Sequence, residues 1–282
     1  MDKKQRYFKI TEPMPGFYEI TSSFVQMHLV VGQHHALLVD TGYGFMNLPG
    51  IVRNITELPL YIVNSHGHFD HACGNSSFHQ SVYIHPADIP VFKIYNSEQC
   101  RGIMYDSMRK VQNFLFFLPL LPRTVSRESC LHDDFDDFIE VTEGYTFELG
   151  GKTAEVIELP GHTPGSIGLY CRELRLLITS DAINSNVYMF LPESTKLSVY
   201  RESLYKAKSI DFDFFVTGHQ SRLYPKRLLD DYIDVADHLD YEKGKPQKEH
   251  ELTPGKEIRR CVQQGKPGKN AAGIVISADK LD

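Results

Sequence analysis

One six-residue segment carries an unusual density of side chains that can bind metal. It reads His66-Gly67-His68-Phe69-Asp70-His71, so three imidazoles and one carboxylate occur within six positions. These groups are typical ligands of zinc, manganese and iron. Because alternate residues of an extended turn point the same way, His66 and His68 can bind one ion while Asp70 and His71 face another. The segment therefore predicts a metal site with room for two ions.

The remaining ligands must come from other segments, because a single turn cannot surround a metal ion. Three candidates each follow an apolar run that is typical of a strand. His162 lies in a loop rich in Pro and Gly, and Asp181 and His219 come directly after later apolar runs. We expect these polar strand ends to complete the site.

Together these residues resemble the metallo-β-lactamase superfamily. Its His-x-His-x-Asp-His signature matches residues 66–71, and a Gly-His-Thr-x-Gly segment at His162, a bridging Asp181 and a final His219 follow in the family's order. The resemblance extends from about residue 17 to residue 222. It implies an α/β fold, namely an αβ/βα four-layer sandwich of two mixed β-sheets with outer helices and the metal site at one edge between the sheets.

The resemblance also implies a role for each candidate ligand. One metal ion would be bound by His66, His68 and His162, the other by Asp70, His71 and His219, and Asp181 would bridge the two. Two divalent ions are expected, with zinc as the first choice and iron or manganese as alternatives. Asp40, in a turn that resembles the family's early Asp-x-Gly, would support the metal loop through contacts to its ligands.

A site of this kind predicts a metal-dependent hydrolase. A metal-bridging hydroxide would attack an ester-like carbonyl or a phosphorus, since two adjacent ions lower the pKa of bound water and hold it beside the substrate. Asp70 would act catalytically by accepting a proton as the intermediate breaks down. The expected substrate is a small organic ester, either a thioester or a lactone. Asn184 and Tyr188 are candidates for hydrogen bonds to its carbonyl, unless they simply occupy a loop.

Individual branches of the superfamily fit to different degrees. The best-known β-lactamases use Cys where this chain has Asp181, which disfavours antibiotic hydrolysis. Quorum-quenching lactonases carry a Tyr shortly after the bridging Asp, where Asn184 and Ser185 stand here, and glyoxalase II enzymes usually have Gly-Asp-Thr in place of Ser180–Ala182. The branch thus stays open between the thioester and lactone hydrolases.

Two other reactions remain as alternatives. A mononuclear non-haem iron oxygenase of the persulfide dioxygenase type would use only His66, His68 and Asp181. A phosphodiesterase of the same superfamily is the second alternative, although no basic surface or aromatic stacking platform for nucleic acid stands out.

The rest of the chain suggests one main domain. Residues 1–242 are expected to form it, including a helical cap inserted at about residues 86–135, and the aromatic run 113–118 could line a substrate pocket or pack on the core or a second subunit. Residues 243–282 are rich in Lys, Gly, Pro and Gln and are expected to form a linker, with an edge strand at 272–278.

The composition of the chain limits its expected binding partners and its expected location in the cell. The net charge of −6 and the absence of a basic block argue against binding to nucleic acid or to an anionic membrane, which leaves a small-molecule substrate and a homodimer as the expected partners. Five scattered cysteines without a CxxC pair are typical of reduced thiols, so the cytoplasm is the expected location. No apolar run is long enough to span a membrane.

Overall fold

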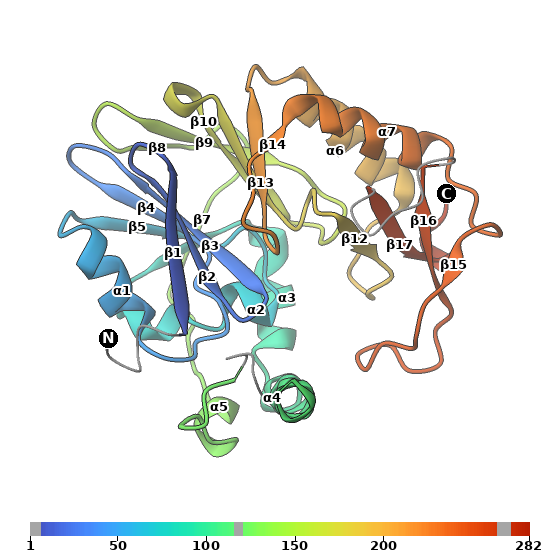
Figure 1. Ribbon diagram of the computed structural model, residues 1–282, viewed down its shortest axis with the longest axis horizontal. Helices are drawn as coiled ribbons and strands as arrows, with labels where there is room; N and C mark the ends of the chain where they lie inside the picture. The colour runs from blue at the N-terminus through green and yellow to red at the C-terminus, as the bar shows by residue number, and fades with distance from the viewer. Residues whose placement is uncertain (1–6, 116–120, 264–271) are drawn as a thin grey trace.

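The computed structural model describes residues 7–115, 121–263 and 272–282. Two large sheets face each other, with helices on their outer sides, and a smaller third sheet lies beside the second helical layer (Figure 1). The helices are α1 (Leu48–Ile55), α2 (Phe69–Ala72), α3 (Ile89–Tyr95), α4 (Glu98–Phe114), α5 (Glu128–Leu131), α6 (Leu197–Ser209) and α7 (Leu229–Asp237).

The first sheet contains seven strands, and their order across the sheet is the same as their order along the chain. It begins as an antiparallel meander from β1 to β4 and continues in parallel from β4 to β7. Its strands are β1 (Phe8–Met14), β2 (Phe17–Ser22), β3 (Val25–Val31), β4 (Ala36–Val39), β5 (Leu60–Val63), β6 (Val82–Ile84) and β7 (Phe138–Glu140). Every residue of β4 is buried, as expected for a strand covered on both faces.

The second sheet has six strands in the order β14-β13-β11-β10-β9-β8. All neighbours are antiparallel except β11 and β13, which run in parallel. Its strands are β8 (Thr146–Glu148), β9 (Thr153–Glu158), β10 (Ile167–Cys171), β11 (Leu176–Ser180), β13 (Phe214–Thr217) and β14 (Tyr224–Pro225).

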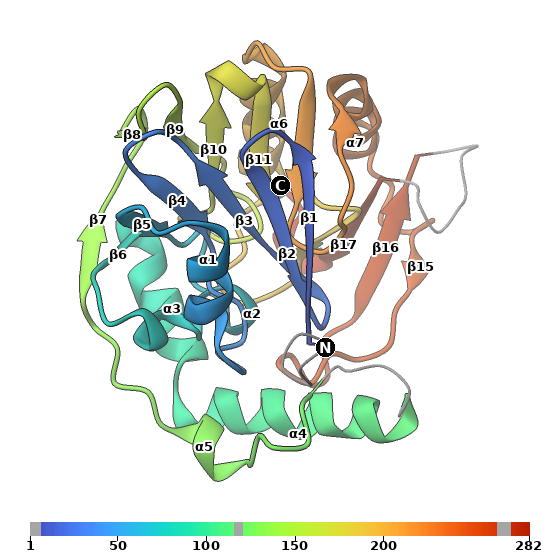
Figure 2. The ribbon, with the colours of Figure 1, turned by 60° about the vertical axis from the view of Figure 1, so that its left-hand side comes forward.

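Three hydrophobic clusters hold these layers together. One lies between the two sheets and joins side chains such as Leu37 and Val63 to Leu169 and Ile178. The others pack α1 and α4 on the outer face of the first sheet, and α6 and α7 on the outer face of the second. The fold is therefore the predicted αβ/βα sandwich, and α4 runs across one end of it (Figure 2).

The region expected to form a cap contains three of the helices. Residues 86–135 hold a short 3-10 turn (Pro86–Asp88) followed by α3, α4 and α5. Ser97 is the N-cap of α4, and its hydroxyl accepts a hydrogen bond from the Cys100 amide. Part of the aromatic run 113–118 lies outside the described residues, so its expected packing stays a prediction.

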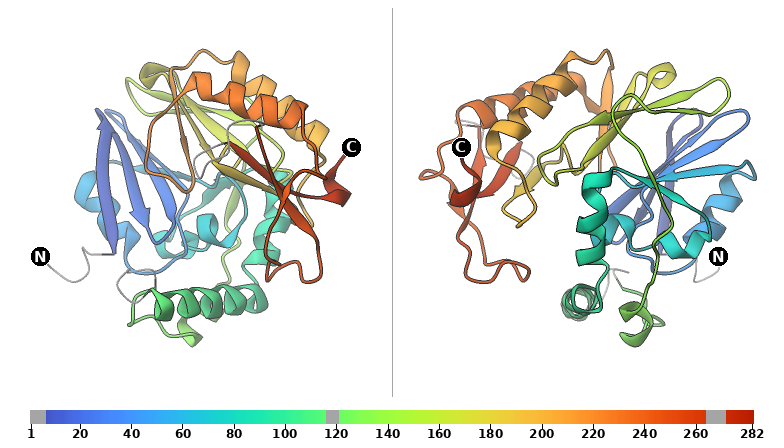
Figure 3. Two further views of the ribbon diagram at one scale, coloured as in Figure 1. Left: turned by 45° about the vertical axis from the view of Figure 1, so that its right-hand side comes forward. Right: turned by 180° about the vertical axis from the view of Figure 1, so that it is seen from behind.

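The C-terminal segment differs from the expected linker and edge strand. A third sheet has the order β12-β17-β16-β15, and its strands are β12 (Asn186–Met189), β15 (Lys245–Pro246), β16 (Ile258–Val262) and β17 (Gly273–Ser277). β17 is an inner strand, because it pairs in parallel with β12 and antiparallel with β16, and all five of its residues are buried. In Figure 3 this sheet lies beside α6 and α7.

His28 gives the fold a pH dependence that can be measured. This β3 residue is fully buried, both of its ring nitrogens lack a hydrogen-bond partner, and burial followed by the nearby charge of His71 lowers its pKa to about 3. Only the unfolded chain then takes up a proton at this position as the pH falls below about 6.5, so stability is lost on acidification. His28→Leu should reduce the slope of unfolding free energy against pH by up to about 1.4 kcal/mol per unit between pH 6 and 4.

Chemical denaturation of the metal-free chain across this pH range measures that slope. The exposed His132 offers a control, because His132→Leu should leave the slope as it is in the parent chain. An unchanged slope in His28→Leu would show that His28 is protonated equally in the folded and unfolded states.

Candidate metal centre

The structure brings all seven predicted ligands to one end of the sandwich. The 66–71 loop follows β5 of the first sheet, whereas His162, Asp181 and His219 follow β9, β11 and β13 of the second. Helix α2 begins inside the loop, directly after His68. The site therefore lies where strands of the two facing sheets end together.

The first group consists of His66, His68 and His162, whose potential ligand atoms lie within 4.8 Å of one another. His68 Nδ1 is 2.9 Å from His162 Nε2. The outward nitrogens are held elsewhere: His162 Nδ1 donates to the Tyr188 carbonyl at 2.8 Å, and His68 Nε2 donates to Glu193 Oε1 at 2.7 Å. When its outward nitrogen donates, a neutral imidazole keeps a lone pair on the facing nitrogen, and that lone pair can bind a cation.

The second group consists of Asp70, His71 and His219. Asp70 Oδ2 lies 3.6 Å from the Nε2 atoms of both histidines. His219 Nδ1 donates to the Phe24 carbonyl at 2.6 Å, and His71 Nδ1 contacts Asp40 Oδ2 at 2.8 Å. As in the first group, each ring is fixed by one nitrogen and turns the other toward the centre.

Asp181 lies between the two groups. Its Oδ2 is 3.0 Å from His219 Nε2 and 3.7 Å from His162 Nε2, while its Oδ1 is 3.8 Å from His71 Nε2. The backbone of Gly218 packs against the carboxylate, where a Cβ would overlap Oδ1 and lie 2.8 Å from His71 Cε1. Only glycine fits at that position without displacing a candidate ligand.

The donor set fits a pair of divalent cations. His66 Nε2 and His71 Nε2 are buried and have no hydrogen-bond partner, although such atoms are normally paired. Five imidazole nitrogens and two carboxylates without a thiolate match the preferences of zinc, iron and manganese. The described residues can therefore hold metal at both groups, with Asp181 within reach of each.

The charges of the site favour cations on the side of the carboxylates. Burial alone would raise the pKa of Asp181, but His219, His71 and His162 hold it well below its usual value. Burial would lower the pKa of His219, yet Asp181 and Asp70 raise it to about 10. Burial lowers the pKa of His66 well below its usual value, and that of His162 to about 4. His66 and His162 are thus neutral and ready to donate lone pairs.

Asp40 contacts the candidate ligand His71 and the start of the ligand loop. It is fully buried, and besides His71 its carboxylate accepts from the Ser65 amide at 2.7 Å, the Ser65 hydroxyl at 2.8 Å and the Ser180 hydroxyl at 3.0 Å. Its backbone has φ = 67°, a left-handed conformation that Asp tolerates better than most residues. Asp40 thus ties the start of the ligand loop to the strand end that carries Asp181.

Two further carboxylates were missed by the sequence analysis. Asp88, at the end of the 3-10 turn, accepts from the amides of Gly67 and Gly165 at 2.7 Å and from the Thr163 hydroxyl at 2.8 Å, so it joins the loops of both sheets. Glu193 bonds His68. The strand-to-proline boundary before Asp88 is a weak sequence signal, and nothing in the sequence distinguishes Glu193.

The two candidate substrate contacts differ in exposure. Asn184 is buried, and its amide donates to Asp181 Oδ1 at 3.1 Å, so its side chain supports the carboxylate instead of facing a substrate. Tyr188 is 41% exposed, and contact with a substrate stays a prediction for it. The most open ligands are Asp70 and His219, whose side chains are 16% and 25% exposed. Solvent thus reaches the site from their side.

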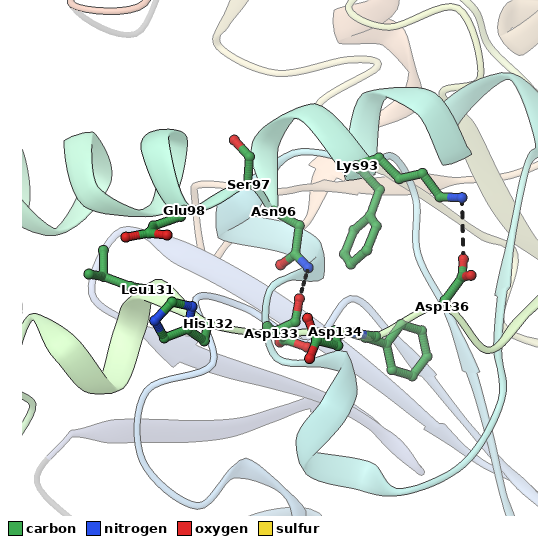
Figure 4. Close-up of a pocket in the computed structure, with 11 residues that line it drawn as sticks. Lys93, Asn96, Ser97, Glu98, Leu131, His132, Asp133, Asp134 and Asp136 are labelled. Atoms are coloured by element: carbon green, nitrogen blue, oxygen red, sulfur yellow. Dashed lines mark hydrogen bonds and ion pairs between the residues drawn. The ribbon is translucent and has the colours of Figure 1, made fainter.

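A separate hollow of about 400 Å³ lies between α3, α4 and the segment before β7 (Figure 4). Its lining is acidic, with Asp133, Asp134 and Asp136 among the residues drawn. Lys93 pairs with Asp136, and the Asn96 amide donates to the Asp133 carbonyl. None of the seven candidate ligands lines it, so this hollow is distinct from the metal centre.

Comparison with known proteins identifies the family. Residues 20–219 match the model of the metallo-beta-lactamase superfamily, and the chain belongs to that superfamily of metallo-hydrolase enzymes. It is 28% identical over 239 residues to a Gallus gallus protein named acyl-coenzyme A thioesterase MBLAC2, covering 78% of this chain and 82% of the relative. It is 24% identical over 212 residues to the hydroxyacylglutathione hydrolase GloC of Haemophilus influenzae, covering 74% and 82%.

A solved structure shows the same fold. The metallo-beta-lactamase from Pontibacter korlensis aligns with a TM-score of 0.57 and 16% identity over 82% of this chain and 99% of that one. Within the described residues, no helix combines the length and the apolar character needed to cross a bilayer.

Proposed function

We propose that this protein uses two divalent metal ions to hydrolyse an acyl thioester, with zinc as the first choice of metal. The observation that carries the proposal is the convergence of the seven ligand candidates, with Asp181 close to His71, His162 and His219. The names of two relatives, an acyl-coenzyme A thioesterase and a hydroxyacylglutathione hydrolase, both describe thioester cleavage and favour a thioester over a lactone.

The residues would divide the work as follows. His66, His68 and His162 would hold one ion, Asp70, His71 and His219 the other, with Asp181 shared between them. Two adjacent cations supply an activated water and polarise the substrate carbonyl.

Asp70 would move the proton in this reaction. Its Oδ2 lies beside His71 and His219 on the open side of the site, where it can accept a proton from the attacking water and pass it to the leaving thiolate. Two exposed aromatic residues, Phe24 and Tyr188, flank the centre through carbonyls that hold His219 and His162, and they offer apolar surface for an acyl group.

The presence of the second group argues against the oxygenase alternative. A mononuclear iron site of that type needs only His66, His68 and Asp181. Here Asp70, His71 and His219 are also brought together, and both histidine rings are fixed by partners. A phosphodiesterase would use the same ligands, so only substrate turnover separates it from a thioesterase.

A substrate panel tests the proposal. The chain is stripped of metal with a chelator, reloaded with zinc, iron or manganese, and assayed with an acyl-CoA, a glutathione thioester, a lactone and a phosphodiester. We expect thioester cleavage that disappears on stripping and returns on reloading. Thioester cleavage by the stripped chain, or turnover of the phosphodiester alone, would refute the proposal, and oxygen uptake with one bound iron would favour the oxygenase.

A further inference from the structure

The carboxylate of Glu193 connects the metal loop to a distant part of the chain. It lies in the loop between β12 and α6, with its side chain 12% exposed. Its Oε1 accepts from His68 Nε2 at 2.7 Å and from the Tyr95 hydroxyl at 2.7 Å. Tyr95 ends α3 and packs edge-on against the His68 ring, with centroids 4.4 Å apart. Glu193 and Tyr95 therefore enclose the outer side of this imidazole.

This contact decides which nitrogen of His68 can bind a cation. A carboxylate accepts only, so in the neutral ring Nε2 carries the proton and Nδ1 has the lone pair that faces His162. A partner of this kind also raises the basicity of a ligating imidazole and fixes the plane of its ring. Loss of Glu193 would leave His68 free to rotate or to adopt the other tautomer.

Glu193 is itself held by the C-terminal segment. Lys280, in the short turn after β17 (Ala278–Lys280), is 9% exposed, and its ammonium donates to the carbonyls of Pro192 and Ser194 at 2.8 and 2.6 Å. These carbonyls flank Glu193 in the chain. Burying an ammonium group costs free energy unless hydrogen bonds replace those it made with water. Both of these hydrogen bonds go to carbonyls of the loop that carries Glu193.

Further hydrogen bonds connect the Glu193 loop to the C-terminal segment on one side and to the metal centre on the other. Lys256 donates to the Phe190 carbonyl at 2.9 Å and to Asp279 at 3.0 Å, which ties the start of the loop to the turn that carries Lys280. On the other side, the Ser194 hydroxyl donates to the His162 carbonyl at 2.9 Å. One loop thus joins the C-terminal segment to two candidate ligands.

We propose that Glu193 is a positioning residue for His68, and that Lys280 of the C-terminal segment holds Glu193 in place. The segment then acts as part of the metal centre. This inference depends on the proposed function only in its premise that the site binds metal.

The test is a metal titration of the metal-free chain by competition with a chromophoric chelator, using zinc alone. We expect the wild type to bind two equivalents. In Glu193→Ala one equivalent should weaken by about 10- to 100-fold while the other is retained. Glu193→Gln should lose less, because its amide oxygen still accepts from His68. Lys280→Met should weaken the same equivalent, and the exposed Glu202→Ala should match the wild type.

A purely structural role predicts a different pattern. The affinity for both zinc equivalents would then fall together with the melting temperature, or the affinity for neither would change in Glu193→Gln and Glu193→Ala. Either result would show that Glu193 does not position His68. Normal zinc affinity in a folded Lys280→Met chain would show that Lys280 is not needed to hold Glu193 in place. If wild type and variants show the expected titrations but no thioester is cleaved, only the proposed function fails.

Discussion

Asp181→Ala is expected to bind fewer than two metal ions and to lose at least about 1,000-fold in kcat/KM for a thioester. The physical reason is its position, since the carboxylate lies within 3.8 Å of His71, His162 and His219 and offers an oxygen to each group. Without it, the negative charge between the two cations is lost and they repel each other.

Metal analysis and kinetics on one preparation check this result. Asp134→Ala, which removes an exposed carboxylate of the hollow near α4, should retain the metal content and rate of the parent chain. If Asp181→Ala kept both metal ions and most of its activity, Asp181 would not be the shared ligand.

Asp88→Ala should destabilise the fold by about 3–5 kcal/mol and lower metal affinity as well. Its carboxylate accepts three buried hydrogen bonds, from Gly67, Thr163 and Gly165, and each donor left unpaired costs about 1–3 kcal/mol. Because these donors flank His66, His68 and His162, the loss also loosens the first group of ligands.

Denaturant titration of the metal-free chain isolates the stability effect. Thr163→Val removes one of the three donors and should cost only a fraction of what Asp88→Ala costs. A change below about 1 kcal/mol in Asp88→Ala would mean that water replaces the carboxylate and that the two loops do not depend on it.

The sequence predicted the ligands of this site more fully than their supports. His66 to His71 stand in one compact motif, and His162, Asp181 and His219 follow apolar runs, so residue type and position both carried a signal. The structure places all seven together. Their roles as metal ligands stay a prediction until metal is measured.

The supporting carboxylates could not be found in this way. Asp88 and Glu193 are ordinary acidic residues in loops, and their importance comes from partners 21 to 125 positions away in the chain. Asp40 was predicted only because it stands in a family-like turn. Contacts over such sequence distances leave no local pattern to interpret.

The layers of the sandwich were predictable and the third sheet was not. Apolar runs such as those of β4 and β5 predict strands by their composition. β17 also has an apolar run, but its partner β12 lies more than 80 residues earlier, and the polar composition of residues 243–270 is typical of a linker. Position within a sheet depends on such distant pairing, so an inner strand was predicted as an edge strand.

Anomalous scattering from crystals of the metal-loaded chain is the most direct test of the central claim. We expect two peaks, one among His66, His68 and His162 and one among Asp70, His71 and His219, with Asp181 contacting both. A single peak, or metal bound only outside these seven residues, would contradict it.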